Sequence, residues 1–414
     1  MRNPLSSMVS SPNKPGARHA LLAGFLGWTL DAFDFFVIVF LYDTLAREFS
    51  VPKKAIVLTT AATLAFRPVG ALLFGLLSDR YGRRFPLIAN VLYFSVIEVL
   101  CGFAPNYRIF FILRALFGIG MGGEWGVGAS LAMEAAPKRW RGILSGILQS
   151  GYSMGYLLAS VAARFVLPTL GWRWMFWLGA LPAMLALYIR TKVPESEAWA
   201  QHRASSMAQL LRVVASHWKR FVYLVILMTF MMFLSHGTQD LYPDFLKEVH
   251  KLKQSQVANI AILYNCGAIV GAVLFGAFSQ KAGRRMGMLA ALGLCLVVIP
   301  LWAFGGGVLA FAIAPVSLQM GVQGAWGVIP VHLNELAADS ARGLMPGLTY
   351  QLGILLASPT NSIQYALHEK FGYSWALAGF ETVTILSLAL LLWRGAEAHG
   401  KNFLRETPSE IAPA

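Results

Sequence analysis

The segment SHGTQD, Ser235 to Asp240, places polar side chains inside an otherwise apolar stretch of the chain. Its histidine changes charge close to neutral pH and can share a proton with an aspartate one helical turn away. A second acidic pair, Asp31 and Asp34, stands in another apolar stretch, at a spacing that puts both on one helix face. Two carboxyl groups so close in a poorly hydrated place cannot both ionise without cost. The acidic pair has the residue types of a proton carrier, although an inert hydrogen-bonded pair would have the same spacing, and the polar groups of SHGTQD need a reason to lie in an apolar stretch.

The composition places these segments in a membrane. Of the 414 residues, 57% are hydrophobic and 13% are charged, against about 25% charged in an average soluble protein. Apolar stretches of about 20 residues recur, each long enough to cross roughly 30 Å of hydrocarbon as a helix. We therefore predict an all-α membrane protein with twelve transmembrane helices. Their expected ranges are 21–45, 55–78, 86–104, 108–134, 143–168, 172–190, 221–246, 255–280, 287–304, 307–335, 344–367 and 373–394.

Basic residues are distributed unevenly between the loops. If the N-terminus is cytoplasmic, 22 lysines and arginines fall on the cytoplasmic side and nine on the other. This bias follows the positive-inside rule and predicts that both termini are cytoplasmic. The formal net charge of +14 is then explained by topology, which argues against a nucleic-acid partner. We expect a multi-pass protein of a plasma membrane or bacterial inner membrane, in contact with lipid.

The sequence is an internal duplication. A shift of 201 positions places GLLSDRYGRR, Gly75–Arg84, on GAFSQKAGRR, Gly276–Arg285, and the same shift superposes Glu134 and Arg141 on a second Glu–Arg pair. Two six-helix halves around a central site are typical of alternating-access transporters. The expected divisions are a tail at 1–20, a first bundle at 21–190, a linker at 191–220, a second bundle at 221–394 and a tail at 395–414.

Three arginines, Arg67, Arg114 and Arg164, lie within predicted helices. Arg67 is close to the middle of the second helix. Because a guanidinium keeps its proton, Arg67 needs an anion, either a protein carboxylate such as Asp34 or the carboxylate of a substrate. Arg114, early in the fourth helix, could extend to the nearby membrane surface. Gln149 and Tyr152 lie one turn apart on the fifth helix, where they could line a cavity or pack between helices.

The loop after the second helix resembles a signature of the major facilitator superfamily. That pattern is Gly-x-x-x-Asp-Arg-x-Gly-Arg-Arg, and GLLSDRYGRR matches each constrained position, whereas the second copy has Gln280 in place of the aspartate. In the family this loop latches the outward-facing state, and an arginine at the position of Arg114 is linked to proton coupling. The resemblance implies gating roles for Gly75, Asp79, Arg80, Arg83, Arg84, Glu134 and Arg141.

SHGTQD itself resembles the signature of fungal monocarboxylate permeases and of bacterial lactate and sialate:proton symporters. Their pattern, Asn-x-x-Ser-His-x-Ser-Gln-Asp-x-x-x-Thr with Thr tolerated for the second Ser, is matched here except at its ends, where Met232 and Asp244 stand. The resemblance implies that His236 and Asp240 affect substrate affinity and proton coupling. This branch also uses a mid-membrane arginine and the glutamine of a Tyr-Gln-Leu-Gly run, which correspond to Arg67 and Gln351.

The leading expectation is a proton-coupled symporter of a small organic monocarboxylate such as lactate or pyruvate, working as a monomer. The substrate-binding residues would be Arg67, Gln149, Tyr152 and Gln351, and the proton-coupling residues Asp31, Asp34, Arg114, His236 and Asp240. The proton gradient would supply the energy, with no cofactor and no metal. The alternatives are a symporter of a bulkier acid, such as sialic or an aromatic acid, and less favourably a sugar porter or drug exporter of the same superfamily. An enzyme is disfavoured because no HExxH pattern occurs and the histidines are scattered along the chain.

Overall fold

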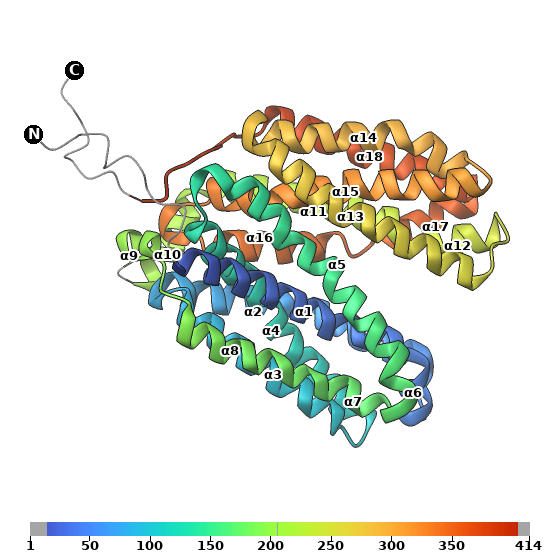
Figure 1. Ribbon diagram of the computed structural model, residues 1–414, viewed down its shortest axis with the longest axis horizontal. Coiled ribbons are helices and arrows are strands. Elements are labelled where there is room, and N and C mark those ends of the chain that lie inside the picture. The colour runs from blue at the N-terminus through green and yellow to red at the C-terminus, as the bar shows by residue number, and fades with distance from the viewer. Residues whose placement is uncertain (1–14, 205, 405–414) are drawn as a thin grey trace, which may run out of the picture.

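The chain forms two helical bundles, drawn one below the other in Figure 1. The structure is a computed structural model that describes residues 15–204 and 206–404. Throughout these two ranges every regular element is a helix. The fold class is therefore the predicted one, an all-α membrane protein of twelve crossings in two bundles.

The first bundle is built on close contacts between α2 and α4. Glycines of α4 allow this approach, since a Cβ at Gly118 would lie 2.2 Å from the carbonyl oxygen of Thr63 on α2. Small residues at such contacts let two backbones touch in a membrane. The elements of this half are α1 (Pro15–Glu48), α2 (Lys53–Tyr81), α3 (Arg84–Gly102), α4 (Tyr107–Ala135), η2 (Lys138–Trp140), α5 (Arg141–Phe165), α6 (Leu167–Leu170), α7 (Trp172–Trp177), η3 (Leu178–Ala180) and α8 (Leu181–Lys192).

The second bundle repeats this plan after a short linker. A Cβ at Gly271 of α13 would lie 2.0 Å from the carbonyl oxygen of Met320 on α15, which is the corresponding contact of this half. The linker contains α9 (Glu197–His202) and α10 (Met207–Ser216). The second half contains α11 (Trp218–Gln239), α12 (Tyr242–Glu248), α13 (Gln254–Ala282), α14 (Arg284–Phe304), α15 (Val308–Leu336), η4 (Asp339–Ala341), α16 (Leu344–Leu356), α17 (Thr360–Phe371) and α18 (Tyr373–Arg394).

Several predicted crossings differ from simple apolar helices. In the described part of the chain nine helices are long and apolar enough to cross a membrane by themselves. The predicted crossing at 143–168 is α5, which is rich in glycine and serine. The crossing at 172–190 is broken at η3, just before Pro182, and the one at 344–367 is broken between α16 and α17, at Pro359. Proline lacks the amide proton that a helix interior requires, so each break falls where a proline stands.

The two bundles meet at one end of the molecule and draw apart toward the other (Figure 1). We call the meeting end the linker end, because α9 and α10 lie there, together with the loops after α2, α4, α13 and α15. Among the described residues the hydrogen bonds between the halves lie at the linker end or near the middle of the helices. At Gly126 of α4 a Cβ would lie 2.6 Å from the Cα of Gly347 on α16, so the bundles are in backbone contact there.

Candidate functional site

Arg67 lies in the middle of the first bundle, on α2. Only 3% of it is exposed, and α4 packs so closely that a Cβ at Gly122 would lie 1.9 Å from the Arg67 carbonyl oxygen. Its Nε and Nη2 atoms have no hydrogen-bond partner among the described residues. Asp31 and Glu124 are the carboxylates within electrostatic reach of it. A buried guanidinium with open donors has the geometry to bind a carboxylate.

Aromatic rings from both halves pack together beside Arg67. Tyr350 of α16 stacks on Trp125 of α4 with ring centroids 4.3 Å apart, and Trp28 of α1 stacks on Tyr152 of α5 at 5.4 Å. Tyr350 also meets Trp28 edge-on, which joins the two stacks. Both tyrosines lie within electrostatic reach of Arg67. The rings therefore form an apolar wall with a cation at its edge, an arrangement that suits a small organic anion.

The two predicted glutamines are buried, Gln351 beside the glycine that packs on Arg67 and Gln149 one turn before Tyr152 on α5. Gln351 is fully buried, and its Nε2 donates to the carbonyl oxygen of Gly122 at 3.4 Å, so it touches the glycine that packs on Arg67. The Oε1 atoms of Gln351 and Gln149 have no hydrogen-bond partner in the ranges that the structure describes. Because a buried polar atom without a partner costs free energy, these oxygens have the geometry to accept a hydrogen bond from a ligand.

Asp31 and Asp34 lie in a buried cluster of charged groups that includes a pair which the sequence did not reveal. Glu98 of α3 accepts a hydrogen bond from Arg114 Nη1 at 2.7 Å, and neither side chain is exposed. Neither aspartate is exposed, and their four carboxyl oxygens have no hydrogen-bond partner among the described residues. A Cβ at Gly179, in the break before α8, would lie 3.3 Å from Asp34 Oδ1. Arg114 is therefore an ion-pair partner inside the bundle and does not extend to the membrane surface.

The SHGTQD segment lies at the end of α11, where the helix stops before α12. His236 Nδ1 is 3.2 Å from Asp240 Oδ2, which also accepts from Asn361 Nδ2 at 3.0 Å. About 42% of the His236 side chain and 32% of the Asp240 side chain are exposed. Two further polar groups of the segment form hydrogen bonds with Gln319 of α15. Gln239 Nε2 donates to the Gln319 side-chain oxygen, and Gln319 Nε2 donates to the Thr238 hydroxyl group. The His–Asp pair thus stands on an accessible side of the bundle while the acids of α1 are fully buried.

A buried network around Asp79 joins the two halves at the linker end. The Asp79 carboxylate accepts hydrogen bonds from the backbone N–H groups of Gly343, at 2.7 Å, and Leu344, at 2.9 Å, at the start of α16. Arg83 pairs with Asp79 and donates two hydrogen bonds to Glu134, at 3.2 and 2.9 Å. A negative charge facing a helix N-terminus is stabilised by the helix dipole. The first half therefore holds the second by this helix end.

The duplicated loop makes the corresponding contact in the opposite direction. Gln280 Oε1 accepts from the backbone N–H of Gly142, at 2.9 Å, at the start of α5. Arg284 donates two hydrogen bonds to Glu335, at 2.9 and 3.1 Å, as Arg83 does to Glu134. The two loops differ in charge and in bonding. The Asp79 carboxylate accepts from two backbone N–H groups, whereas the Gln280 amide accepts from one and donates to the carbonyl oxygen of Lys138 at 3.0 Å. A neutral acceptor makes weaker hydrogen bonds than an ionised one, so the Asp79 side is the stronger of the two.

Residues 395–404, which we call the strap, run from the end of α18 across the linker end. Phe403 is 1% exposed, with the guanidinium carbons of Arg141 and Arg342 at 3.8 and 4.2 Å from its ring centroid. Lys401 pairs with Asp339 at 2.8 Å, and its carbonyl oxygen accepts from Arg141 at 2.6 Å. Partial burial acts to raise the pKa of Asp339, but the Lys401 hydrogen bond and the Arg342 charge hold it below its usual range. That ion pair is therefore intact at neutral pH and is lost only on acidification through the lowered pKa.

Replacing Phe403 with alanine should loosen the closed linker end. The ring makes two cation–π contacts worth about 0.5–2 kcal/mol each, and it bridges an arginine of each half. Spin labels on Arg139→Cys and Lys281→Cys, in a cysteine-free background, should report a larger fraction of long distances in the variant. Leu404→Ala, which changes the exposed neighbouring residue, is the control. Identical distance distributions for Phe403→Ala and the parent would contradict a holding role for the strap.

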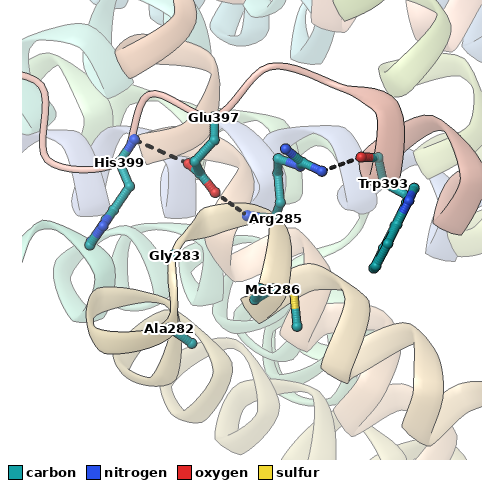
Figure 2. A pocket seen from close by; sticks show the side chains of 7 residues that line it. All are labelled: Ala282, Gly283, Arg285, Met286, Trp393, Glu397 and His399. Carbon is teal, nitrogen blue, oxygen red and sulfur yellow. Dashed lines mark hydrogen bonds between the residues drawn. The ribbon is translucent and has the colours of Figure 1, made fainter.

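Two pockets lie at the linker end, and neither contains a predicted substrate residue. One of about 430 Å³ is drawn in Figure 2, where Glu397 stands between His399 and Arg285. Glu397 accepts from the backbone N–H groups of both residues, at 3.1 and 2.9 Å, and so caps the start of α14. The other, of about 440 Å³, is lined in part by Arg84, which corresponds to Arg285 under the shift of the duplication. The pockets are therefore a feature of the duplicated loops, separate from Arg67.

The sequence matches a family model described as Major Facilitator Superfamily over residues 24–358. The chain belongs to this superfamily. Among its relatives, a "Carboxylic acid transporter protein homolog" of Saccharomyces cerevisiae is 30% identical over 84% of the chain, which spans 61% of that protein's length. The sialic acid transporter NanX of Escherichia coli is 26% identical over 94% of the chain and 96% of its own length. In fold, the proton:xylose symporter XylE is similar with a TM-score of 0.75, at 20% identity, covering 94% of this chain and 98% of that one. The protein is thus a membrane transporter of the superfamily and not an enzyme.

For this major facilitator protein the structure places Tyr152 and Gln351 close to Arg67, and it divides the predicted gating residues. Gly75 and Asp79 contact the start of α16, where a Cβ at Gly75 would lie 2.8 Å from the Leu344 Cα. Arg84 instead donates to the carbonyl oxygen of Arg190, and Arg80 lies over the ring of Tyr81. These two arginines therefore bind within the first half.

Four important contacts were not predicted from the sequence. They are the Arg83–Glu134 pair, the Glu98–Arg114 pair, the packing of Glu124 against Gly27 and the contact of Phe403 in the strap with Arg141. A signal for the first was present, because Arg83 and Glu134 recur together at Arg284 and Glu335, and a pair kept in both copies predicts a contact. The other three have no duplicate, and their partners come from different helices.

Proposed function

We propose that the protein is a proton-coupled symporter of a small organic monocarboxylate such as lactate or pyruvate. The observation that carries this proposal is the buried guanidinium of Arg67, whose Nε and Nη2 atoms have no partner among the described residues and which stands beside an aromatic wall and Gln351. Arg67 would bind the carboxylate, and Tyr152 and the two glutamines would bind the rest of a small polar acid. The names of the yeast and E. coli relatives, which refer to organic acids, support the same class of substrate.

The proton would be carried by acids on both sides of this site. Asp31 and Asp34 are buried without partners, beside the Glu98–Arg114 pair. The His236–Asp240 pair is partly exposed, and Arg67 lies within electrostatic reach of His236. We assign proton entry to the exposed pair and proton retention to the buried acids, because a buried charge is costly unless it is neutralised or paired.

The direction of access follows from the charge bias of the loops. We place the linker end in the cytoplasm, as the positive-inside rule favours, together with both termini. The contacts of Asp79 and Gln280 would then close the cytoplasmic side, and the partly exposed His236 and Asp240 would face the outside. Substrate and proton would enter from the outside, and rocking of the two bundles would release both into the cytoplasm.

A bulkier acid is the second candidate, and the packing around Arg67 argues against it. Trp28, Trp125 and Tyr350 are at most 5% exposed and pack against one another. A substrate of the size of sialic acid needs more room beside these buried rings than a three-carbon acid does. Competition by sialic acid at concentrations similar to those of lactate would reverse this preference.

The test is uptake of labelled lactate and pyruvate by proteoliposomes that contain the purified protein. With an acidic exterior and the membrane potential clamped at zero, both labels should accumulate above equilibrium. A protonophore should abolish that accumulation and leave lactate–lactate exchange. Uptake that ignores the pH gradient would exclude proton coupling, and labelled sugar taken up in place of the acids would exclude the substrate class.

A further inference from the structure

Glu124 stands in the middle of α4 in a recess made by glycines. It is 1% exposed, and neither of its carboxyl oxygens has a hydrogen-bond partner in the part of the chain that the structure describes. A Cβ at Gly27 of α1 would lie 2.2 Å from Glu124 Oε1, and one at Gly128 would lie 3.0 Å from it. α1 therefore leaves space at position 27 that this carboxyl group occupies. A buried carboxyl group in membrane-spanning helices is costly and is commonly functional.

Two charged groups face Glu124, Asp31 of α1 and Arg67 of α2. On the side of α8 its recess is closed by the apolar side chain of Leu185, which would lie 3.9 Å from a Cβ at Gly27. Asp31 faces Arg67, Glu98 and Arg114, so it has two cations within reach. Glu124 differs from Asp31 in having Arg67 as its single facing cation.

The middle of the first bundle holds more buried acids than buried bases. Its four carboxyl groups are those of Asp31, Asp34, Glu98 and Glu124, and its two guanidinium groups are those of Arg67 and Arg114. Arg114 already forms an ion pair with Glu98, with 2.7 Å between Arg114 Nη1 and Glu98 Oε2. When a substrate carboxylate binds Arg67, the buried negative charge rises by one, and Arg67 no longer balances Glu124. The net charge of the cluster returns to its value in the empty site if Glu124 takes up one proton.

We propose that Glu124 balances Arg67 in the empty transporter and accepts the symported proton when a substrate carboxylate takes its place. This role rests on the proposed function and specifies it, since it predicts one proton carried for each monocarboxylate. Binding of the anion favours protonation of Glu124, and protonation of Glu124 frees Arg67 for the anion. The two events are linked through one guanidinium, and linkage of this kind is reciprocal.

Glu381 of α18 provides a matched comparison. It is also a fully buried glutamate without a hydrogen-bond partner among the described residues, and it too lies against a glycine of the first helix of its half, Gly237. No cationic group faces it within the described ranges. It therefore has the burial and the glycine contact of Glu124 but not the arginine, and Glu381→Gln serves as the control for Glu124→Gln.

The experiment compares Glu124→Gln, Glu381→Gln and the parent protein in proteoliposomes, with labelled lactate as the probe and a pH-sensitive dye inside. For Glu124→Gln we expect lactate–lactate exchange to continue, whereas pH-driven accumulation and proton entry per lactate fall by about tenfold or more. Glu381→Gln should accumulate lactate like the parent. Accumulation by Glu124→Gln, loss of exchange together with accumulation, or equal loss in both variants would each overturn the role of Glu124.

Gly27→Ala and infrared spectroscopy keep the proposal testable if Glu124→Gln does not fold. The added methyl group occupies the recess and should shift the pH dependence of lactate uptake, and an unchanged pH profile would count against the proposal. Infrared difference spectra, acid minus neutral, are recorded without substrate for the parent and for each variant. The protonated-carboxyl band of the parent should also be present in Glu381→Gln. In Arg67→Gln the protonated carboxyl group should already be present at neutral pH. If the parent protein takes up no lactate, the proposed function is wrong and the coupling role falls with it. If the parent takes up lactate normally and Glu124→Gln still accumulates it, only the role of Glu124 is wrong.

Discussion

Replacement of Arg67 by alanine is expected to reduce proton-driven lactate uptake by roughly 30-fold or more, because removal of one member of a buried charge pair costs about 2–5 kcal/mol. The substrate carboxylate loses its cation, and Asp31 and Glu124 lose the positive charge that faces them. Arg67→Lys should recover only part of the rate, because an ammonium group keeps the charge but not the planar fork that binds a carboxylate through two hydrogen bonds. The measurement is the initial rate of labelled lactate uptake at a fixed pH gradient.

Arg164→Ala is the control for this experiment. Arg164 also belongs to a membrane-spanning helix, α5, but its side chain is exposed and lies near the end of that helix. Its removal should leave the uptake rate close to that of the parent. Full activity of Arg67→Ala would show that the substrate binds elsewhere, and equal losses in both variants would point to a general effect of removing positive charge.

The sequence predicted those parts of the fold that depend on local pattern and on the duplication. Apolar length located the crossings, and the shift of 201 positions paired the two loops that close the linker end. Arg67 could be identified because a permanent charge in an apolar stretch must have a partner, whichever helix supplies it. His236 and Asp240 were selected from the resemblance of SHGTQD to the symporter signature, and they do form a pair one helical turn apart.

The sequence could not show which acid faces which arginine. Arg114 pairs with Glu98, and Glu124 rather than Asp34 joins Asp31 beside Arg67, because of the way in which α1, α2, α3 and α4 pack. Such pairings depend on glycines such as Gly27, whose missing side chain is a property of the neighbouring helix and not of the acid. The strap was beyond prediction for the same reason, since Phe403 is held by arginines of both bundles.

Replacement of Asp79 by asparagine is expected to shift the transporter away from the state closed at the linker end by roughly 100-fold, since hydrogen bonds to a charged group contribute about 1.5–3 kcal/mol each. The carboxylate accepts from Gly343 and Leu344 and pairs with Arg83, and it is fully buried. An asparagine has one oxygen for these three donors, and its own NH₂ group would face a donor. Spin labels on Thr169→Cys of the first bundle and Ser255→Cys of the second both lie at the end of the molecule away from the linker end. As that end closes, the fraction of short distances between the two labels should rise.

Gln280→Leu tests whether charge, and not contact alone, makes the Asp79 latch the stronger one. Gln280 occupies the duplicated position and accepts from Gly142 N–H with a neutral amide, so its loss removes a weaker bond and should shift the same label distances far less. If Gln280→Leu opened the linker end as much as Asp79→Asn, the two loops would act as equal latches. If neither variant changed the distances, closure would depend on the backbone contact between Gly126 and Gly347 and on Phe403 instead. The expected inequality follows from the exchange of a carboxylate for an amide between the two loops.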